Sequence, residues 1–197
     1  MRSQDLKRAK RDVRKAVLAR RDAMPQAERD SASDAIARRF LALRELDGAR
    51  IAMLFWSFGS EVSTVPLLEG LRAMGIRTAL PRIVDGALEV RAYETGDPVT
   101  ATPFGAMEPA GGEILRPEDD DVIVTPAVAF DRRGARVGYG GGYYDAFFPR
   151  TRGGARRIGV AFALQVVQGE LPAGHADVRV DAIVTERETI ECRDGGA

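Results

Sequence analysis

Apolar residues along the chain follow two patterns, continuous runs and repeats at helical spacing. The continuous runs predict buried strands at 50–56, 122–125, 158–164 and 182–185, and shorter apolar stretches predict strands at 77–83 and 88–93. The apolar run that begins at residue 122 continues beyond the predicted strand as far as residue 130. Apolar residues three and four positions apart predict helices at 4–22, 26–45 and 62–74, and another helix begins near 143–148. Residues 95–117 are rich in Gly and Pro and are expected to form a long irregular connection.

Buried strands that alternate with helices are typical of one fold class. They predict an α/β protein with three layers, in which a mainly parallel sheet carries helices on both faces. The length of 197 residues fits one domain at 1–190 and a short C-terminal tail at 191–197. Ligands bind such sheets at the carboxyl ends of the strands, so segments 56–61 and 125–144 and the loop before Asp181 are expected to converge.

Composition narrows the class of protein. The chain is 45% hydrophobic and 29% charged, which is usual for a globular protein. The chain has no run of 18 apolar residues, so no membrane span is expected. The charged N-terminus does not resemble a secretory signal. With Cys192 as the single cysteine, an internal disulfide is ruled out, and together these features predict a cytoplasmic location. The single histidine, His175, lies in a loop-like stretch, which disfavours catalysis by a nucleophilic triad.

Charge is unevenly distributed although the formal net charge is zero. Residues 1–22 hold nine Lys and Arg against three Asp. Lys7, Lys10, Arg11 and Arg14 fall on neighbouring positions of the first predicted helix. Such a face is most often simply solvated, but here it also suggests one local anionic partner rather than broad binding of nucleic acid.

The segment Arg136–Asp145, with sequence RVGYGGGYYD, is the most informative part of the chain. Its four glycines, Gly138, Gly140, Gly141 and Gly142, allow close approach of the backbone to a ligand. Consecutive backbone N–H groups in such a loop can hold a phosphate, particularly between a strand and a helix start. The loop matches neither common nucleotide-binding pattern. A plain glycine-rich turn is the alternative, which the flanking Arg136, Tyr pair and Asp145 disfavour.

Four segments together identify a resemblance. The stretches 126–131 and 134–145, the basic segment Lys10–Arg14 and the Ser60–Val62 segment resemble the 5-formyltetrahydrofolate cyclo-ligase family over about residues 7–187. The resemblance implies an ATP-dependent reaction that converts 5-formyltetrahydrofolate to 5,10-methenyltetrahydrofolate and releases ADP and phosphate. It further implies that the formyl oxygen attacks the γ-phosphate, after which N10 displaces phosphate and closes the ring.

The resemblance also implies roles for particular residues. ATP is expected to contact Lys10, Arg14, Arg136, Gly138, Tyr139, Gly140, Gly141, Gly142, Tyr143 and Tyr144. The folate is expected to contact Trp56, Glu61, Tyr139, Gly140, Gly141, Gly142 and Tyr143, with the loop lying where the γ-phosphate meets the formyl oxygen. Arg136 and Tyr143 are the expected catalytic residues. Apart from the resemblance, Trp56 has the pattern of a core residue that ends a buried strand.

A Mg²⁺ ion is implied as well, with Asp145 and Asp181 in the positions of the family's metal-binding aspartates. Mg²⁺ prefers a few carboxylates together with phosphate oxygens, which suits this chemistry. The family often has a basic residue inside the glycine run, where this chain has Gly141. Arg82 and Arg136 are the candidates to supply that missing positive charge.

Two other interpretations compete with a cyclo-ligase. One is a related ATP-dependent ligase or salvage protein that uses the same scaffold for another heterocycle, with a different pocket around Trp56 and Glu61. The other is an RNA-binding protein that uses the basic helix, which would call for aromatic residues interleaved with the basic ones. The expected partners are therefore 5-formyltetrahydrofolate and ATP, without nucleic acid or membrane, and the expected state is a monomer.

Overall fold

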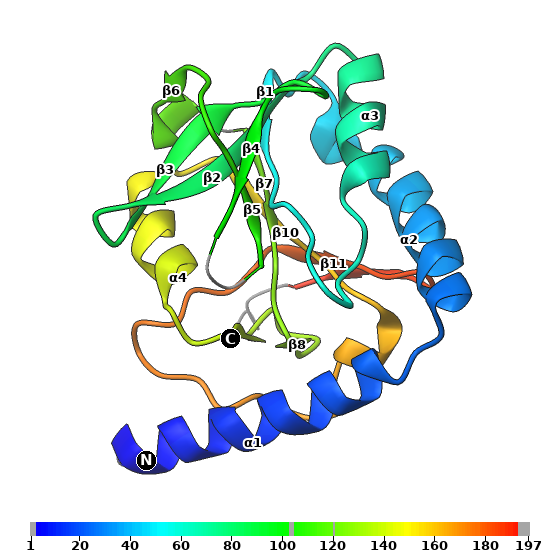
Figure 1. The fold of residues 1–197 in the computed structure, drawn as a ribbon. Helices are drawn as coiled ribbons and strands as arrows, with labels where there is room; N and C mark the ends of the chain where they lie inside the picture. The colour runs from blue at the N-terminus through cyan, green and yellow to red at the C-terminus, as the bar shows by residue number, and fades with distance from the viewer. Residues whose placement is uncertain (1–2, 103–104, 120, 193–197) are drawn as a thin grey trace.

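A central sheet of eight strands organises the protein (Figure 1). The computed structural model describes residues 3–102, 105–119 and 121–192. The strand order across the sheet is β12-β11-β10-β7-β1-β2-β3-β6. In chain order these strands are β1 (Ile51–Met53), β2 (Arg77–Val84), β3 (Ala87–Ala92), β6 (Ile114–Leu115), β7 (Val122–Thr125), β10 (Arg156–Val160), β11 (Ala182–Val184) and β12 (Thr189–Glu191).

Parallel pairing defines the centre of this sheet. Strands β11, β10, β7, β1 and β2 run parallel to their neighbours, for example with Ala52 opposite Val122 and Ile158 opposite Val124. The pairs β11–β12, β2–β3 and β3–β6 are antiparallel and close both edges. The prediction of a mainly parallel sheet is therefore confirmed.

Helices cover both faces of the sheet, as predicted (Figure 1). Helices α2 (Gln26–Leu41) and α3 (Val65–Ala73) lie on one face and α4 (Tyr143–Phe147), followed by the 3₁₀ turn η3 (Phe148–Arg150), lies on the other. Neighbouring strand residues point to opposite faces, so Leu54 packs under α2 and α3 while Met53 packs under Phe147. This two-sided burial explains why the strand sequences are apolar at consecutive positions. No helix in the described ranges is both long and apolar enough to cross a bilayer.

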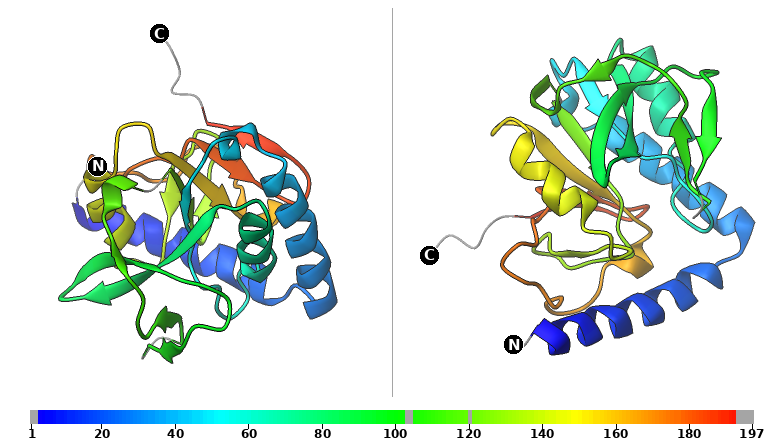
Figure 2. Two further views of the ribbon diagram at one scale, coloured as in Figure 1. Left: turned by 90° about the horizontal axis from the view of Figure 1, so that it is seen from above. Right: turned by 60° about the vertical axis from the view of Figure 1, so that its left-hand side comes forward.

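Helix α1 (Ser3–Asp22) lies across the end of the sheet where β1, β7 and β10 finish (Figure 2). It contacts a two-stranded sheet of β8 (Ala129–Phe130) and β9 (Arg136–Val137) and the 3₁₀ turn η4 (Ala163–Gln165). Val17 is 3% exposed and packs with Val13 against Val128 and Val137. This contact places the basic helix over the carboxyl ends of the parallel strands.

Several predicted boundaries are wrong. The segment expected to be irregular contains β6, the 3₁₀ turn η2 (Pro117–Asp119) and a hairpin of β4 (Val99–Ala101) and β5 (Met107–Pro109). The second helix ends at Leu41, and the 3₁₀ turn η1 (Arg44–Leu46) follows it. The apolar run after residue 120 is divided at Pro126 between β7 and β8, because proline lacks the N–H that a central strand needs.

The first two residues of the predicted C-terminal tail belong to the folded domain. Glu191 belongs to β12, whose Ile190 is 5% exposed, and the Cys192 N–H donates to the Asp181 carbonyl at 2.9 Å. A single apolar residue in a three-residue edge strand gives too short a pattern to recognise in the sequence. The remainder of the predicted tail, 193–197, lies outside the described residues.

Gly159 in β10 supplies a test of this packing. A Cβ atom at this position would lie 2.6 Å from Cε1 of Phe130, whose side chain is fully buried and cannot move aside. We expect Gly159→Ala to lower the free energy of unfolding by about 1–3 kcal/mol, measured by urea denaturation. Gly153→Ala is the control, because nothing lies within 4 Å of its added Cβ. Equal stability of the two variants would contradict this account.

Candidate active site

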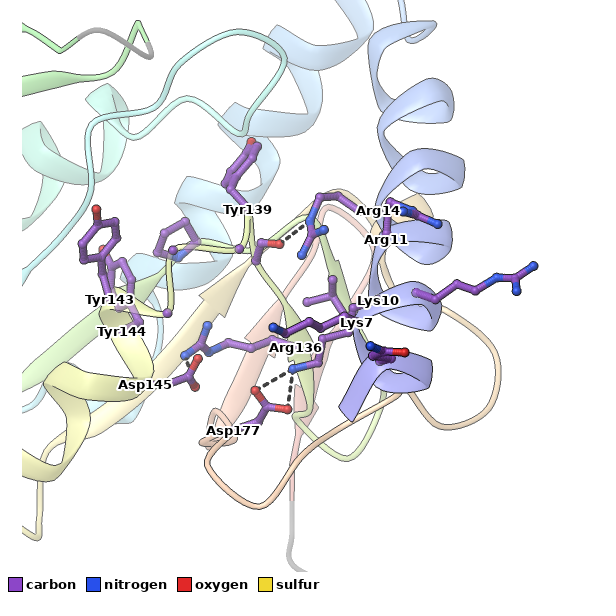
Figure 3. A pocket seen from close by; sticks show the side chains of 18 residues that line it. Lys7, Lys10, Arg11, Arg14, Arg136, Tyr139, Tyr143, Tyr144, Asp145 and Asp177 are labelled. Carbon is purple, nitrogen blue, oxygen red and sulfur yellow. Dashed lines mark hydrogen bonds and ion pairs between the residues drawn. The ribbon is translucent and has the colours of Figure 1, made fainter. Parts of the chain in front are cut away.

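A basic pocket of about 760 Å³ lies between α1 and the glycine loop, here defined as residues 138–142 (Figure 3). Its walls come from one face of α1, from the loop and the start of α4, and from the segment before β11. The lining residues are Gln4, Lys7, Arg8, Lys10, Arg11, Arg14, Pro126, Arg136, Val137, Gly138, Tyr139, Gly140, Gly141, Gly142, Tyr143, Tyr144, Asp145 and Asp177. Six of the side chains in this list are Lys or Arg and two are carboxylates, so the pocket suits an anion.

Two cations of α1 connect the helix to the rest of the pocket (Figure 3). Lys10 donates to both carboxylate oxygens of Asp177, at 2.6 and 2.5 Å. Arg14, one turn further along, donates from Nε to the carbonyl of Gly138 at 2.8 Å. Burial acts to raise the pKa of Asp177, but the hydrogen bonds from Lys10 and from the Gly174 N–H and the charge of Lys10 bring that pKa below its ordinary value. Both cations are thus already directed into the pocket.

The glycine loop has a backbone that other residues would not adopt. Gly140 and Gly142 have φ of +111° and +71°. A Cβ at Gly141 would lie 2.5 Å from Cε2 of Tyr143, so the tyrosine ring packs directly on the loop. The helix that follows, α4, has only five residues, which makes its dipole small. An anion in this pocket would therefore depend on the cations and the loop N–H groups more than on a helix terminus.

Arg136 is buried beneath the pocket. Its side chain is 6% exposed, and its Nη2 donates to Asp145 Oδ1 at 2.7 Å. The guanidinium lies 5.2 Å from the ring centre of Phe148 and 5.9 Å from that of Tyr144. Burial lowers the pKa of Arg136, and the charge of Asp145 opposes that effect. Asp145 Oδ1 also accepts the Val178 N–H at 3.0 Å, so this ion pair fixes the loop to the segment before β11.

A second, mostly apolar pocket of about 140 Å³ adjoins the first. Its lining residues are Phe55, Trp56, Phe58, Glu61, Pro81, Ile83, Leu88, Ala106, Met107, Glu108, Pro126, Tyr139, Tyr143 and Tyr144. Trp56 is partly buried, with its ring edge to face with Tyr93 at 5.7 Å between centroids. Pro126, Tyr139, Tyr143 and Tyr144 line both pockets, so a molecule in one would lie beside a molecule in the other.

Glu61 is the carboxylate of the apolar pocket with the most defined surroundings. Its Oε1 accepts the Tyr139 hydroxyl at 2.8 Å and its Oε2 accepts the Phe58 N–H at 3.1 Å. Burial raises the pKa of Glu61, while the hydrogen bonds from Tyr139 and Phe58 and the charge of Arg21 act in the opposite direction. Burial and the nearby Glu61 charge raise the pKa of Tyr139, which keeps this hydroxyl protonated.

Most of the residues expected at the site lie together. Lys10, Arg14, Arg136, Asp145 and the glycine loop line the basic pocket, and Trp56 and Glu61 line the apolar one with Tyr139, Tyr143 and Tyr144.

Asp181 and Arg82 lie elsewhere. Asp181 precedes β11, which runs parallel to β10, so it lies at the amino edge of the sheet, where its Oδ2 accepts the Arg157 N–H at 2.7 Å. Arg82 in β2 donates to the Ala110 carbonyl at 3.2 Å and lines neither pocket.

Among the residues of the two pockets and their surroundings that sequence reasoning missed, three are charged and take part in the contacts described above or line the apolar pocket. Asp177 is separated from Lys10 by 167 residues, and nothing local indicates their pairing. Glu108 comes from the hairpin that was expected to be irregular. Arg21 contacts Tyr139, and the available signal was its spacing of seven residues from Arg14, which places both on one side of α1.

Comparisons with known proteins agree on one family. The model of the 5-formyltetrahydrofolate cyclo-ligase family matches residues 6–186. The chain is 31% identical over 191 residues to the 5-formyltetrahydrofolate cyclo-ligase of Mycolicibacterium smegmatis, covering 93% of this chain and 96% of that protein. It is 29% identical over 178 residues to the protein of the same name from Escherichia coli K12, covering 87% and 97% of the two chains.

Solved structures give the same result. The chain is similar to the 5,10-methenyltetrahydrofolate synthetase of Aquifex aeolicus, with a TM-score of 0.83, 32% identity and 95% coverage of each chain. A synthetase from Mycoplasma pneumoniae shares the fold with a TM-score of 0.75 at 23% identity, covering 90% of this chain and 98% of that one.

The Arg136–Asp145 pair supplies a test of the site's structure. Asp145→Asn keeps an acceptor for the Val178 N–H but leaves the buried Arg136 without an opposite charge in contact. We expect the free energy of unfolding to fall by about 1–3 kcal/mol, measured by urea denaturation. The control is Asp119→Asn, whose partner Arg116 has a side chain 78% exposed and should matter little. A variant as stable as this control would show that the Arg136–Asp145 pair does not support the loop.

Proposed function

Because this chain belongs to the 5-formyltetrahydrofolate cyclo-ligase family, we propose that its basic pocket binds ATP and its apolar pocket binds the pterin end of the folate. The protein is a ligase that converts 5-formyltetrahydrofolate to 5,10-methenyltetrahydrofolate, and ATP is its second substrate. One observation supports the assignment of one substrate to each pocket. The two pockets share a wall made of Pro126, Tyr139, Tyr143 and Tyr144. The reacting groups of two substrates would meet at this wall.

The nucleotide side is supported by charge and backbone geometry. Lys10 and Arg14 extend from α1 toward the glycine loop, and Arg136 lies beneath it. A triphosphate carries more negative charge than Asp177, so it would compete for Lys10, whose side chain is 20% exposed in the pocket. Phosphoryl transfer requires mainly positioning and neutralisation of charge, which these cations and the loop N–H groups supply.

The folate side is supported by shape and by polarity. Trp56, Phe58 and Tyr143 offer the flat apolar surface that a pterin ring requires. Glu61 has its two oxygens held in place and presents an acceptor to the donor edge of the pterin. Tyr139, which is 42% exposed, closes the pocket on the side of the loop.

The chemistry then requires two successive displacement reactions, the first at the γ-phosphorus and the second at the former formyl carbon. The formyl oxygen attacks the γ-phosphorus of ATP, the bond to the bridging oxygen breaks, and ADP leaves with that electron pair. N10 next attacks the former formyl carbon, the C–O bond breaks, and inorganic phosphate leaves while the N10 proton passes to solvent. The chain's contribution is to hold the two substrates in contact across the shared wall, with Arg136 and Tyr143 beside the transferring group.

The basic pocket also fits a Mg²⁺ ion bound together with ATP. Asp145 lines the pocket, and both of its hydrogen bonds use Oδ1, which leaves Oδ2 to a cation. Within the described residues no three His, Cys, Asp or Glu side chains are grouped, and Mg²⁺ commonly takes few protein ligands together with phosphate oxygens. The ion would neutralise charge on the phosphates. Asp181 lines neither pocket, so we do not assign it a part in this site.

The remaining expectations from the sequence stay predictions. These are a monomeric state, a cytoplasmic location, and the absence of nucleic-acid and membrane partners. The competing RNA-binding interpretation loses its main support, because the basic residues of α1 line a pocket. A related ligase for another heterocycle would have to differ at Trp56 and Glu61, which here lie together as expected.

The reaction itself is the first test. We expect the purified protein to convert 5-formyltetrahydrofolate to the methenyl form, followed by absorbance, only when ATP and a divalent cation are both present. Chelation of the cation should stop turnover, and its re-addition should restore it. Turnover that is equally fast without ATP, or no turnover with fresh substrate, would refute the proposal.

The cations of α1 provide a second test. Lys10→Ala and Arg14→Ala should each weaken ATP binding by about 1–3 kcal/mol, the range for charge-assisted hydrogen bonds, measured by calorimetry without folate. Lys15→Ala is the matched control, because Lys15 is exposed on the same helix and lines neither pocket. ATP affinities equal to that of the control would show that Lys10 and Arg14 do not bind ATP and that the basic face of α1 is only solvated.

A further inference from the structure

Arg21 is a charged side chain with almost no access to solvent. It lies in the last turn of α1 and is 3% exposed. Its Nε donates to Ser60 Oγ at 2.9 Å and its Nη2 donates to Tyr139 Oη at 2.8 Å. It also lies over the Tyr139 ring, 5.9 Å from the centroid. A fully buried arginine is uncommon, so its position requires an explanation.

The two hydroxyl groups that Arg21 contacts each lead to a carboxylate. Ser60 Oγ donates to Asp22, and Tyr139 Oη donates to Glu61 Oε1 at 2.8 Å. An arginine can only donate hydrogen bonds, so each hydroxyl oxygen accepts from Arg21. The single proton of each hydroxyl group is then donated to the carboxylate. The chain of donors therefore runs in one direction, from Arg21 through Tyr139 to Glu61.

We propose that Arg21 is a positioning residue of the folate site, which acts through Tyr139 to hold Glu61 as a fixed, ionised hydrogen-bond acceptor for the substrate's N–H edge. This inference rests on the proposed binding of folate in the apolar pocket. Arg21 itself lines neither the basic pocket nor the apolar pocket and so acts without touching either substrate. With Glu61 protonated or Tyr139 rotated, the pocket would present a donor where the pterin requires an acceptor.

The charges around Glu61 support this role. Arg21 of α1 is the cation that acts on Glu61, and Tyr139 of the glycine loop and Glu108 of β5 are the other titratable groups that line the pocket beside it, together with Tyr143 and Tyr144. Burial raises the pKa of Glu61 and the Arg21 charge opposes that rise. Loss of this charge would raise the pKa of Glu61 further, so that Glu61 would remain protonated up to a higher pH.

The cost of burying Arg21 also argues for a functional role. Its Nη1 has no hydrogen-bond partner within the described part of the chain. Burial of an incompletely paired charge opposes folding, so a side chain retained only for stability would be better apolar. A hydrogen-bonded path that ends in the substrate pocket accounts for the charge.

The experiment compares Arg21→Met with Arg20→Met. Arg20 is the adjacent residue of α1, carries the same charge and is exposed, so it controls for loss of one positive charge. We expect Arg21→Met to raise KM for 5-formyltetrahydrofolate about tenfold, the effect of one hydrogen bond worth about 1.4 kcal/mol. The acid limb of kcat/KM for folate should move to higher pH, and the ATP dissociation constant of the free enzyme should stay within about twofold.

Arg21→Lys separates charge from geometry. Lysine keeps the positive charge, so the acid limb should remain near that of the wild type. Its ammonium does not reproduce the planar fork in which Nε and Nη2 of Arg21 donate to Ser60 and Tyr139, so KM should still rise. Melting temperatures accompany each variant. If Arg21→Met does not fold, Arg21→Lys and Tyr139→Phe decide the question through KM and the pH profile.

Two outcomes would overturn the inference. One is an Arg21 variant with the folate KM and pH profile of Arg20→Met, in an enzyme whose wild type is active. The other is an equal loss of ATP and folate binding, which would make Arg21 a structural residue only. Failure of the proposed function is distinguishable, because the wild-type protein itself would then show no ATP-dependent turnover.

Discussion

The packing of α1 across the carboxyl ends of the strands is the contact on which both pockets depend. Val17, which is 3% exposed, anchors the helix against β8 and β9, and burial of one such side chain is worth about 1.5–3 kcal/mol. This anchoring fixes the rotation of the helix. Positions 10, 14 and 21 then share one side, and that side faces the glycine loop. A rotation of α1 by half a turn would remove every one of these cations from the site.

Local patterns were enough to predict much of this arrangement. The continuous apolar runs indicated strands buried on two faces, and the carboxyl-edge rule then brought Trp56, Glu61 and the glycine loop together. Helical spacing placed Lys10 and Arg14 on one face. The glycine loop was recognisable because it holds four glycines within five positions, and two of them, Gly140 and Gly142, take φ of +111° and +71°.

Contacts between distant segments could not be predicted in the same way. The partners of Lys10 and Arg21 lie in other parts of the chain, and no local pattern names them. Asp181 is a different case, since its position before a parallel strand places it at the amino edge of the sheet, away from the ligands. The strand β12 and the β4–β5 hairpin are three residues per strand, which is shorter than any periodic signal.

The hydrogen bond between Lys10 and Asp177 joins residues 167 positions apart, which has a consequence for how the protein is made. During synthesis α1 leaves the ribosome before the strands of the sheet, and Asp177 follows only after most of these strands have been produced. The apolar face of α1 therefore stays exposed until β8 and β9, against which it packs, have been synthesised. A nascent chain that stops before Asp177 would already hold the glycine loop and the cations of α1, but Lys10 would lack its carboxylate partner.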